Sequence, residues 1–97
     1  MSVTFAVLLW PVAGHATELH AYEDDVLCLV ADHRGRVVTR ARSVDPDDSQ
    51  PVETQVIEFA DDAGFRSYMD DERRTAMADR RDACVARTQM WRVDVVD

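Results

Sequence analysis

Residues 54–93, TQVIEFADDAGFRSYMDDERRTAMADRRDACVARTQMWRV, decide the fold because strand and helix patterns alternate along them. The run over residues 52–59 is apolar at alternate positions and rich in β-branched side chains, which predicts a strand. Asp61 or Asp62 then caps a short helix that ends near Met69, since aspartate is a preferred residue at helix starts. The segment therefore begins as a strand followed by a helix.

A second helix and a last strand complete this segment. Asp70 can cap a helix from Asp71 to about Val85. Residues 88–96 then alternate as in a strand, with Gln89, Trp91, Val93 and Val95 opposite Met90, Arg92 and Asp94. The C-terminal half thus reads as strand, helix, helix, strand.

The N-terminal half repeats this order. Residues 3–10 predict a strand, and residues 15–32 carry an apolar stripe at helical spacing. Gly35 follows as the expected left-handed cap residue. Residues 36–42 form the next predicted strand, with Val37, Thr39 and Ala41 on one side and Val38, Arg40 and Arg42 on the other. The polar stretch 43–51 is a surface loop.

The complete order βαββαβ predicts one α+β domain over residues 1–97 with a ferredoxin-like arrangement. In this fold, two helices cover one face of a four-stranded antiparallel sheet. The other face would carry Ala6, Leu8, Trp10, Val38 and Met90, which is too apolar to be left in water. We therefore predict a homodimer in which two such faces pack into a barrel.

Composition excludes several classes of partner. Nineteen acidic residues against eleven basic ones give a net charge of −8, which disfavours nucleic acid and anionic membrane surfaces. The N-terminal stretch imitates a signal peptide, but no positive charge precedes its short apolar run, so a buried strand is preferred. Cys28 and Cys84 lack CxxC spacing and are read as two reduced thiols. We expect a cytoplasmic protein.

Three stretches carry a resemblance to a known superfamily: FAVLLWPVAG (5–14), LHAYEDDVLCLVADHRGRVVTRARSV (19–44) and residues 54–93. Together they resemble the dimeric α/β-barrel superfamily of small ferredoxin-like proteins, and more narrowly a bacterial family of about this length without an assigned function. The resemblance implies the fold and the dimer. It implies little about activity, because members of the superfamily include cofactor-free monooxygenases, lactone isomerases, haem-dependent enzymes and ligand-binding modules.

Candidate site residues follow from residue type and strand position. We expect a small, partly apolar and anionic molecule to bind between sheet and helices, and name as ligand-binding candidates Trp10, Tyr22, Arg40, Glu58 and Arg92. Strand arginines can bind an anion bidentately, or they can instead pair with Glu53, Asp94 or a partner subunit. Glu58 either projects into the barrel or lies in water at a strand end. Both readings of Glu58 remain open.

Chemistry beyond binding has no motif to support it. The alternative function is a cofactor-free oxygenase or isomerase acting on an aromatic or polyketide-like substrate. For an oxygenase, side chains that could hold and polarise a phenolate are candidates by residue type alone, and the catalytic residues stay unknown: Trp10, Tyr22, Tyr68, Arg40 and Arg92. A haem-degrading branch is disfavoured, because the asparagine it relies on is absent from the chain. We predict no cofactor and no metal site. Whether the protein is an enzyme stays open.

The second predicted helix, residues 71–85, leaves one further question. If it is regular, one arginine of each adjacent pair leans over its buried side, either Arg73 with Arg80 or Arg74 with Arg81. The stems can cover apolar surface while the charged heads reach water. Alternatively, Arg73 and Arg80 reach the dimer interface or the mouth of a pocket, and we take them as interface candidates.

Overall fold

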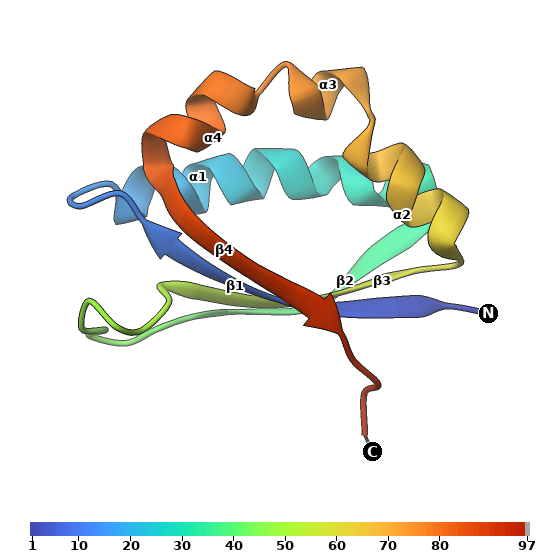
Figure 1. The fold of residues 1–97 in the computed structure, drawn as a ribbon, viewed down its shortest axis with the longest axis horizontal. Helices are drawn as coiled ribbons and strands as arrows, with labels where there is room; N and C mark the ends of the chain where they lie inside the picture. Colours follow the sequence, from blue (N-terminus) through green and yellow to red (C-terminus); the bar gives the residue numbers. More distant parts are fainter. Residues whose placement is uncertain (97) are drawn as a thin grey trace.

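The computed structural model describes residues 1–96 and follows the predicted order with two additional short helices (Figure 1). The elements are β1 (Val3–Pro11), α1 (Ala16–Val26), the 3₁₀ helix η1 (Leu27–His33), β2 (Gly35–Arg42), β3 (Glu53–Phe59), α2 (Asp62–Met69), α3 (Glu72–Thr75), α4 (Ala78–Cys84) and β4 (Val85–Arg92).

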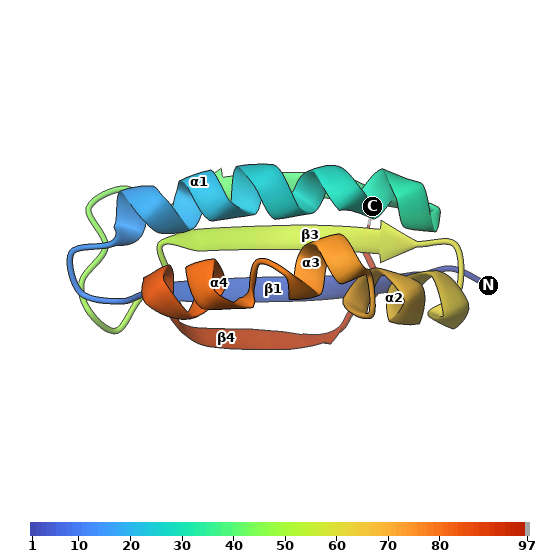
Figure 2. The same cartoon turned by 90° about the horizontal axis from the view of Figure 1, so that it is seen from above.

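The strands form one antiparallel sheet in the order β2-β3-β1-β4, and all helices cover one of its faces. Seen from above, α1 and η1 run along the β2–β3 side, whereas α2, α3 and α4 run along β1 (Figure 2). This is the α+β ferredoxin-like fold that the sequence predicts. The face of the sheet away from the helices is called the open face below.

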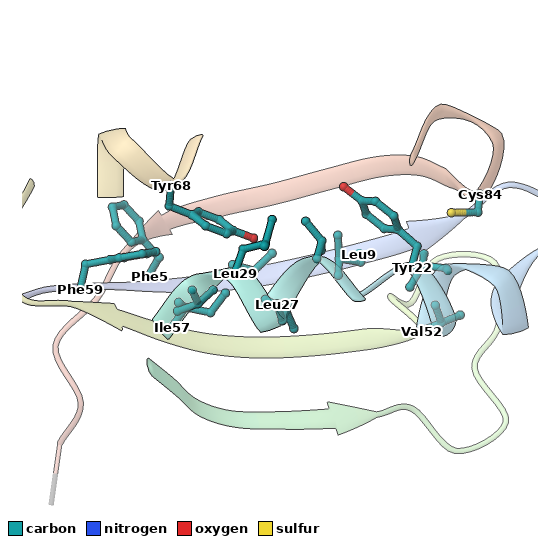
Figure 3. Packing of buried hydrophobic residues seen from close by; sticks show 14 of the residues in the cluster. Phe5, Leu9, Tyr22, Leu27, Leu29, Val52, Ile57, Phe59, Tyr68 and Cys84 are labelled. Carbon is teal, nitrogen blue, oxygen red and sulfur yellow. The ribbon is translucent and has the colours of Figure 1, made fainter. Parts of the chain in front are cut away.

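The core lies between the sheet and the helices. From β1 it takes Val3, Phe5, Val7 and Leu9, which alternate with residues of the open face. Leu19, Tyr22 and Val26 of α1 pack onto them at helical spacing. Figure 3 labels Phe5, Leu9 and Tyr22 of this core together with side chains of η1 and α2, namely Leu27, Leu29 and Tyr68.

Strand β2 differs from its prediction by a change of face. The register shifts between Val37 and Thr39, so that Val37 pairs with Ile57 and Arg40 pairs with Gln55, both on the helix side. One extra residue in a bulge reverses the alternation after it. Arg40 therefore lies on the same side as Val37, and the predicted grouping of Arg40 with Val38 is wrong.

Strand β4 and the second predicted helix also differ. β4 begins at Val85, directly after α4, and Met90 pairs with Val7 on the helix side rather than lying on the open face. The predicted helix 71–85 is divided into α3 and α4. Met77 is the N-cap residue of α4, and it is partly buried against the core. Because α3 and α4 are separate helices, one continuous helical spacing does not relate the arginines of α3 to those of α4.

The turn into β2 assigns different roles to Arg34 and Gly35. Arg34 adopts the left-handed conformation, with φ 59°, where the sequence predicted Gly35. Gly35 is needed for close packing instead, because a Cβ there would lie 2.7 Å from atoms of both Val30 and Phe59. The glycine therefore marks a contact with the core.

Both cysteines are free thiols, as predicted, with Cys28 exposed and Cys84 buried. Within residues 1–96, the helices are too short or too polar to cross a membrane.

Candidate functional site

A cavity of about 300 Å³ lies between the helix side of the sheet and the helices. Its walls are mainly apolar and aromatic and come from every layer of the fold: Phe5, Val7, Leu9, Val26, Leu27, Ile57, Phe59, Phe65, Met69 and Met90. The polar side chains that line it are few: Tyr22, Glu23, Gln55, Tyr68, Arg74, Arg81 and Thr88. Small-molecule sites have this composition, an apolar container with a small number of placed polar groups.

Two tyrosines bring hydroxyl groups into the cavity. Tyr22 comes from α1 and Tyr68 from α2, and Figure 3 shows their hydroxyls pointing toward each other across the space between the elements. Burial raises the pKa of both phenols, and for Tyr22 the neighbouring Glu23 raises the pKa further. Both therefore remain neutral and able to donate a hydrogen bond.

Arg74 of α3 contributes a guanidinium group that is incompletely paired. Its Nε is buried and has no hydrogen-bond partner within residues 1–96, while Nη1 makes one long contact of 3.4 Å with the carbonyl oxygen of Met69. The guanidinium carbon lies 5.2 Å from the ring centre of Tyr68. A buried donor without an acceptor is unfavourable, so Arg74 has hydrogen-bonding capacity at the cavity that the described residues leave unused.

Arg81 of α4 is the second cationic group at the cavity. Its Nη2 lies 3.4 Å from the hydroxyl of Thr88, and its Nη1 lies 4.0 Å from Asp82. Neither contact is a close bidentate pair. Arg74 and Arg81 together give the cavity lining two guanidinium groups, and a guanidinium group suits a carboxylate or a phenolate.

The other arginine of each pair lies outside the cavity. Arg73 contacts Asp71 and Asp32 at 2.7 and 3.0 Å, and Arg80 contacts Asp25 at 2.6 Å. These contacts join the row α2–α4 to α1 and η1. Arg74 and Arg81, one of the two pairs that the sequence analysis offered for the buried side, therefore line the cavity, and Arg73 and Arg80 lie on acidic neighbours.

A buried polar cluster lies at the sheet end of the cavity. Gln55 Nε2 donates to Glu23 Oε1 at 2.7 Å and to Glu53 Oε2 at 2.6 Å. Arg40 donates to Glu53 from Nε and Nη2, at 2.9 and 3.0 Å, and His20 Nδ1 lies 2.8 Å from Glu53 Oε1. The cluster runs from the edge of the sheet to the cavity, and Glu23 and Gln55 are its members in the cavity wall.

The two carboxyl groups of this cluster differ in protonation. Burial raises the pKa of Glu23 more than the hydrogen bond from Gln55 lowers it, and the nearby Glu53 raises it further. Burial acts on Glu53 in the same direction, but hydrogen bonds from Arg40, Gln55 and His20 outweigh burial and lower the pKa of Glu53. Glu53 is therefore the ionised carboxylate, and Glu23 is the group that holds a proton more readily.

The structure places one of the five ligand candidates, Tyr22, in the cavity wall. Arg40 lies on the helix side but is held by Glu53 and by Asp24, which confirms the alternative reading that it pairs with Glu53. Arg92 lies near α2, with its guanidinium carbon 5.8 Å from the ring centre of Phe5. Neither arginine lines the cavity.

Trp10 and Glu58 lie on the open face, on the other side of the sheet from the cavity. Trp10 donates from its indole nitrogen to the carbonyl oxygen of Ser49 at 3.2 Å, and Arg87 lies over its ring at 4.5 Å. Glu58 accepts a hydrogen bond of 3.0 Å from Arg36, which lies on the neighbouring strand β2. The candidates are thus divided between two surfaces.

Several residues of the cavity were missed by the sequence analysis, and two of them carried a readable signal. Glu23 follows Leu19 by four positions and precedes Val26 by three, which places a carboxyl group on the apolar stripe of α1. Gln55 likewise alternates with Ile57 on the buried side of β3. A charged or amide side chain on a buried stripe was the available indication of a site.

The open face retains apolar residues. Ala6, Leu8 and Val56 are partly buried there although no helix covers them, and Trp91 is 47% exposed. Trp91 takes the position on this face that the sequence analysis gave to Met90. Apolar side chains gathered on an uncovered sheet face are typical of an interface.

Within residues 1–96, no group of three or more His, Cys, Asp or Glu side chains lies together as a metal site requires.

Comparison with known proteins supports the fold. No family model matches the chain, and no curated protein matches its sequence. Solved structures do match over nearly the whole chain. A DABB-family protein with a ferredoxin-like fold from Mesorhizobium loti is 21% identical, with a TM-score of 0.68 over 99% of this chain and 98% of that one.

Two further solved structures are similar at lower identity. A dimeric ferredoxin-like protein of unknown function from Thermobifida fusca is 11% identical, with a TM-score of 0.71 over 98% of this chain and 92% of that one. SnoaB, a cofactor-independent oxygenase from Streptomyces nogalater, is 14% identical, with a TM-score of 0.70 over 98% and 95%. At these identities the likeness establishes the ferredoxin-like fold that dimeric α/β-barrel proteins share.

Proposed function

We propose that the protein binds a small, partly apolar anion in the cavity between sheet and helices. The observation that carries this proposal is the buried Nε of Arg74, a donor without an acceptor in a cavity that is otherwise largely apolar. A ligand carboxylate or phenolate would supply the acceptor, and Arg81 would add a second charge-assisted contact. The apolar walls would take the body of the ligand.

The dimensions of the cavity favour a compact aromatic ligand. Its volume of about 300 Å³ is at the lower end of the range for small-molecule sites. Aromatic walls formed by Phe5, Phe59 and Phe65 favour stacking of a flat ring. We therefore name the ligand class as an arylcarboxylate or a related aromatic anion.

A thermal-shift screen tests this proposal. The probes are arylcarboxylates, their neutral amides, quinones and haem, because a ligand of the folded state raises the melting temperature by mass action. We expect arylcarboxylates to stabilise the wild-type chain and their amides to do so much less. The proposal is refuted if no arylcarboxylate raises the melting temperature, or if each amide is as effective as its acid.

Matched variants localise the binding. Arg74→Met removes the guanidinium at the cavity and keeps the apolar stem, whereas Arg73→Met alters the adjacent arginine, which is paired with aspartates outside the cavity. We expect Arg74→Met to abolish the carboxylate-dependent shift and Arg73→Met to retain it, with circular dichroism showing that both variants fold. An equal shift in the two variants would place the ligand elsewhere.

We further propose that the chain forms a homodimer through the open face, as the apolar character of Leu8, Val56 and Trp91 supports. A structural neighbour described as dimeric adds to this support. Leu8→Arg, at the middle of this face, is expected to yield a folded monomer in native mass spectrometry at micromolar concentration. A wild-type chain that is monomeric under these conditions would refute the dimer.

The interface candidates Arg73 and Arg80 and the cytoplasmic location stay predictions. The competing function, a cofactor-free oxygenase or isomerase, has one observation in its favour. A carboxyl group of raised pKa, Glu23, lies in the wall of the cavity. It favours proton transfer, the chemistry of an isomerase.

A further inference from the structure

We propose that Glu23 is a catalytic acid and base that interconverts the keto and enol forms of an arylpyruvate-like substrate, a compound with an aromatic ring, a carboxylate and an enolisable carbonyl. This inference rests on the proposed function, because it takes the cavity as the binding site. It adds a reaction and a residue that carries it.

The position of Glu23 supports this role. Its side chain lines the cavity although the residue is only 6% exposed. Oε1 accepts a hydrogen bond from Gln55, whereas Oε2 makes no hydrogen bond within residues 1–96 and is not enclosed by protein. One oxygen is therefore held in place and the other is available to a ligand.

Gln55 is itself fixed and acts as the positioning residue. Both hydrogens of its amide are used, one by Glu23 and one by Glu53. Glu53 is in turn held by two hydrogen bonds from Arg40. The carboxyl group of Glu23 thus has an orientation set by three further side chains, as a group that transfers protons at a defined atom requires.

The charges around Glu23 favour a proton that can be both held and released. Glu53 on β3 and burial favour the protonated form, while Gln55, Arg40 on β2 and Arg81 on α4 favour the carboxylate. Tyr22 on α1, Tyr68 on α2 and Cys84 on α4 are further titratable groups near it. A carboxylate with a raised pKa is a stronger base than an exposed one, and its acid form is present closer to neutral pH.

The reaction is a balanced proton shift. With the substrate carboxylate at Arg74 and Arg81, the Glu23 carboxylate takes a proton from the carbon next to the carbonyl group. The C–H electron pair forms a C=C bond, and the carbonyl π pair moves to oxygen, where the hydroxyl of Tyr22 can donate a hydrogen bond to the developing charge. Glu23 then delivers the proton to that oxygen. One C–H bond breaks and one O–H bond forms, without an oxidant or reductant.

The experiment uses phenylpyruvate as the probe and measures two quantities, thermal stabilisation and the rate at which its methylene protons exchange with D₂O by NMR. We expect the wild-type chain to bind the probe and to accelerate exchange over buffer. The Glu23→Gln variant should still bind phenylpyruvate, but its enzymatic exchange rate should be lower than that of the wild type by a factor of about 100 or more. This factor is the usual contribution of a general acid or base. Glu18→Gln, an exposed glutamate on the same helix, is the matched control and should exchange like the wild type.

The outcomes separate the two proposals. A wild-type chain that binds phenylpyruvate without accelerating exchange, or a Glu23→Gln variant that exchanges at the wild-type rate, overturns the catalytic role and leaves the binding function standing. Binding of other arylcarboxylates but not of phenylpyruvate also overturns it. A wild-type chain that binds no arylcarboxylate at all overturns both.

Discussion

Replacing Arg40 with methionine should expose how strongly the buried carboxylate of Glu53 depends on its partner. The Glu53 side chain is 0% exposed and accepts two hydrogen bonds from Arg40, at 2.9 and 3.0 Å. Methionine keeps an apolar stem over the sheet and removes the charge. Gln55 still donates to Glu53 in the variant, but the carboxylate loses its only bidentate cationic partner within residues 1–96.

Breaking one side of a buried ion pair typically costs about 3–5 kcal/mol in the free energy of unfolding. Because Gln55 remains, we expect the lower end, about 3 kcal/mol at pH 7. This is a large fraction of the roughly 5–15 kcal/mol by which natural domains are stable.

The stability deficit of Arg40→Met should depend on pH in a defined direction. In the wild-type chain the pKa of Glu53 is lowered, so its contribution is present above the unfolded pKa, about 4.3, and is lost as pH falls through the folded pKa. In Arg40→Met the hydrogen bonds from Gln55 and His20 remain, but without those from Arg40 we expect burial, the largest influence on Glu53, to raise its pKa above the unfolded value. The variant therefore loses stability as pH rises above that value, and its deficit against the wild type shrinks as pH is lowered from 7 toward 4.

Urea unfolding followed by tryptophan fluorescence and circular dichroism measures this deficit, at one protein concentration because association shifts apparent stability. Arg36→Met is the matched control on the same pair of strands, since the Arg36 side chain is 65% exposed and contacts Glu58 near the surface. Its cost should stay within about 1 kcal/mol. A deficit below about 1 kcal/mol for Arg40→Met at pH 7 would contradict the claim that the buried Glu53 carboxylate depends on Arg40. A deficit that is equal at pH 4 and pH 7 would contradict it as well.

Two further substitutions test the fold. Gly35→Ala places a Cβ 2.7 Å from atoms of the buried Val30 and Phe59, so we expect it to lower the free energy of unfolding by about 1–3 kcal/mol, and an unchanged urea midpoint would contradict this. Asp61→Ala removes the side chain that accepts from the Gly64 amide at 2.8 Å at the start of α2, which should cost about 0.5–2 kcal/mol in the same assay. Asp62→Ala, one residue into the helix and exposed, should cost much less; equal losses would argue against the cap.

Most of the fold could be predicted because the spacing of apolar residues and the residues that begin and end helices indicate the same elements along the chain. The core positions of β1 alternate, and those of α1 recur at helical spacing, as the sequence analysis expected. The start of α2 was also predicted, since Asp61 accepts a hydrogen bond from the Gly64 backbone amide. The cap of α3 was predicted one residue too early, because Asp71 and not Asp70 accepts from the Arg73 backbone amide.

The candidate site was predicted less well, for reasons that are local. The bulge near Val37 reverses the faces of β2, and a strict alternation cannot reveal one extra residue. Arg74 and Arg81 line the cavity, which is one of the two arginine pairs that helical spacing allowed, and spacing alone could not choose between the pairs. Such irregularities arise from tertiary packing, which residue spacing does not record.

The alternation of β1 has a practical consequence for redesign. Its odd positions, including Phe5, Val7 and Leu9, line the cavity, and its even positions face the opposite side of the sheet. Alternate residues of this nine-residue strand therefore belong to two different surfaces, the cavity wall and the open face. A library restricted to odd positions would change the lining of the cavity, and one restricted to even positions would change the open face. Recombining the two libraries should give largely additive effects, because neighbouring side chains on opposite faces share no contacts.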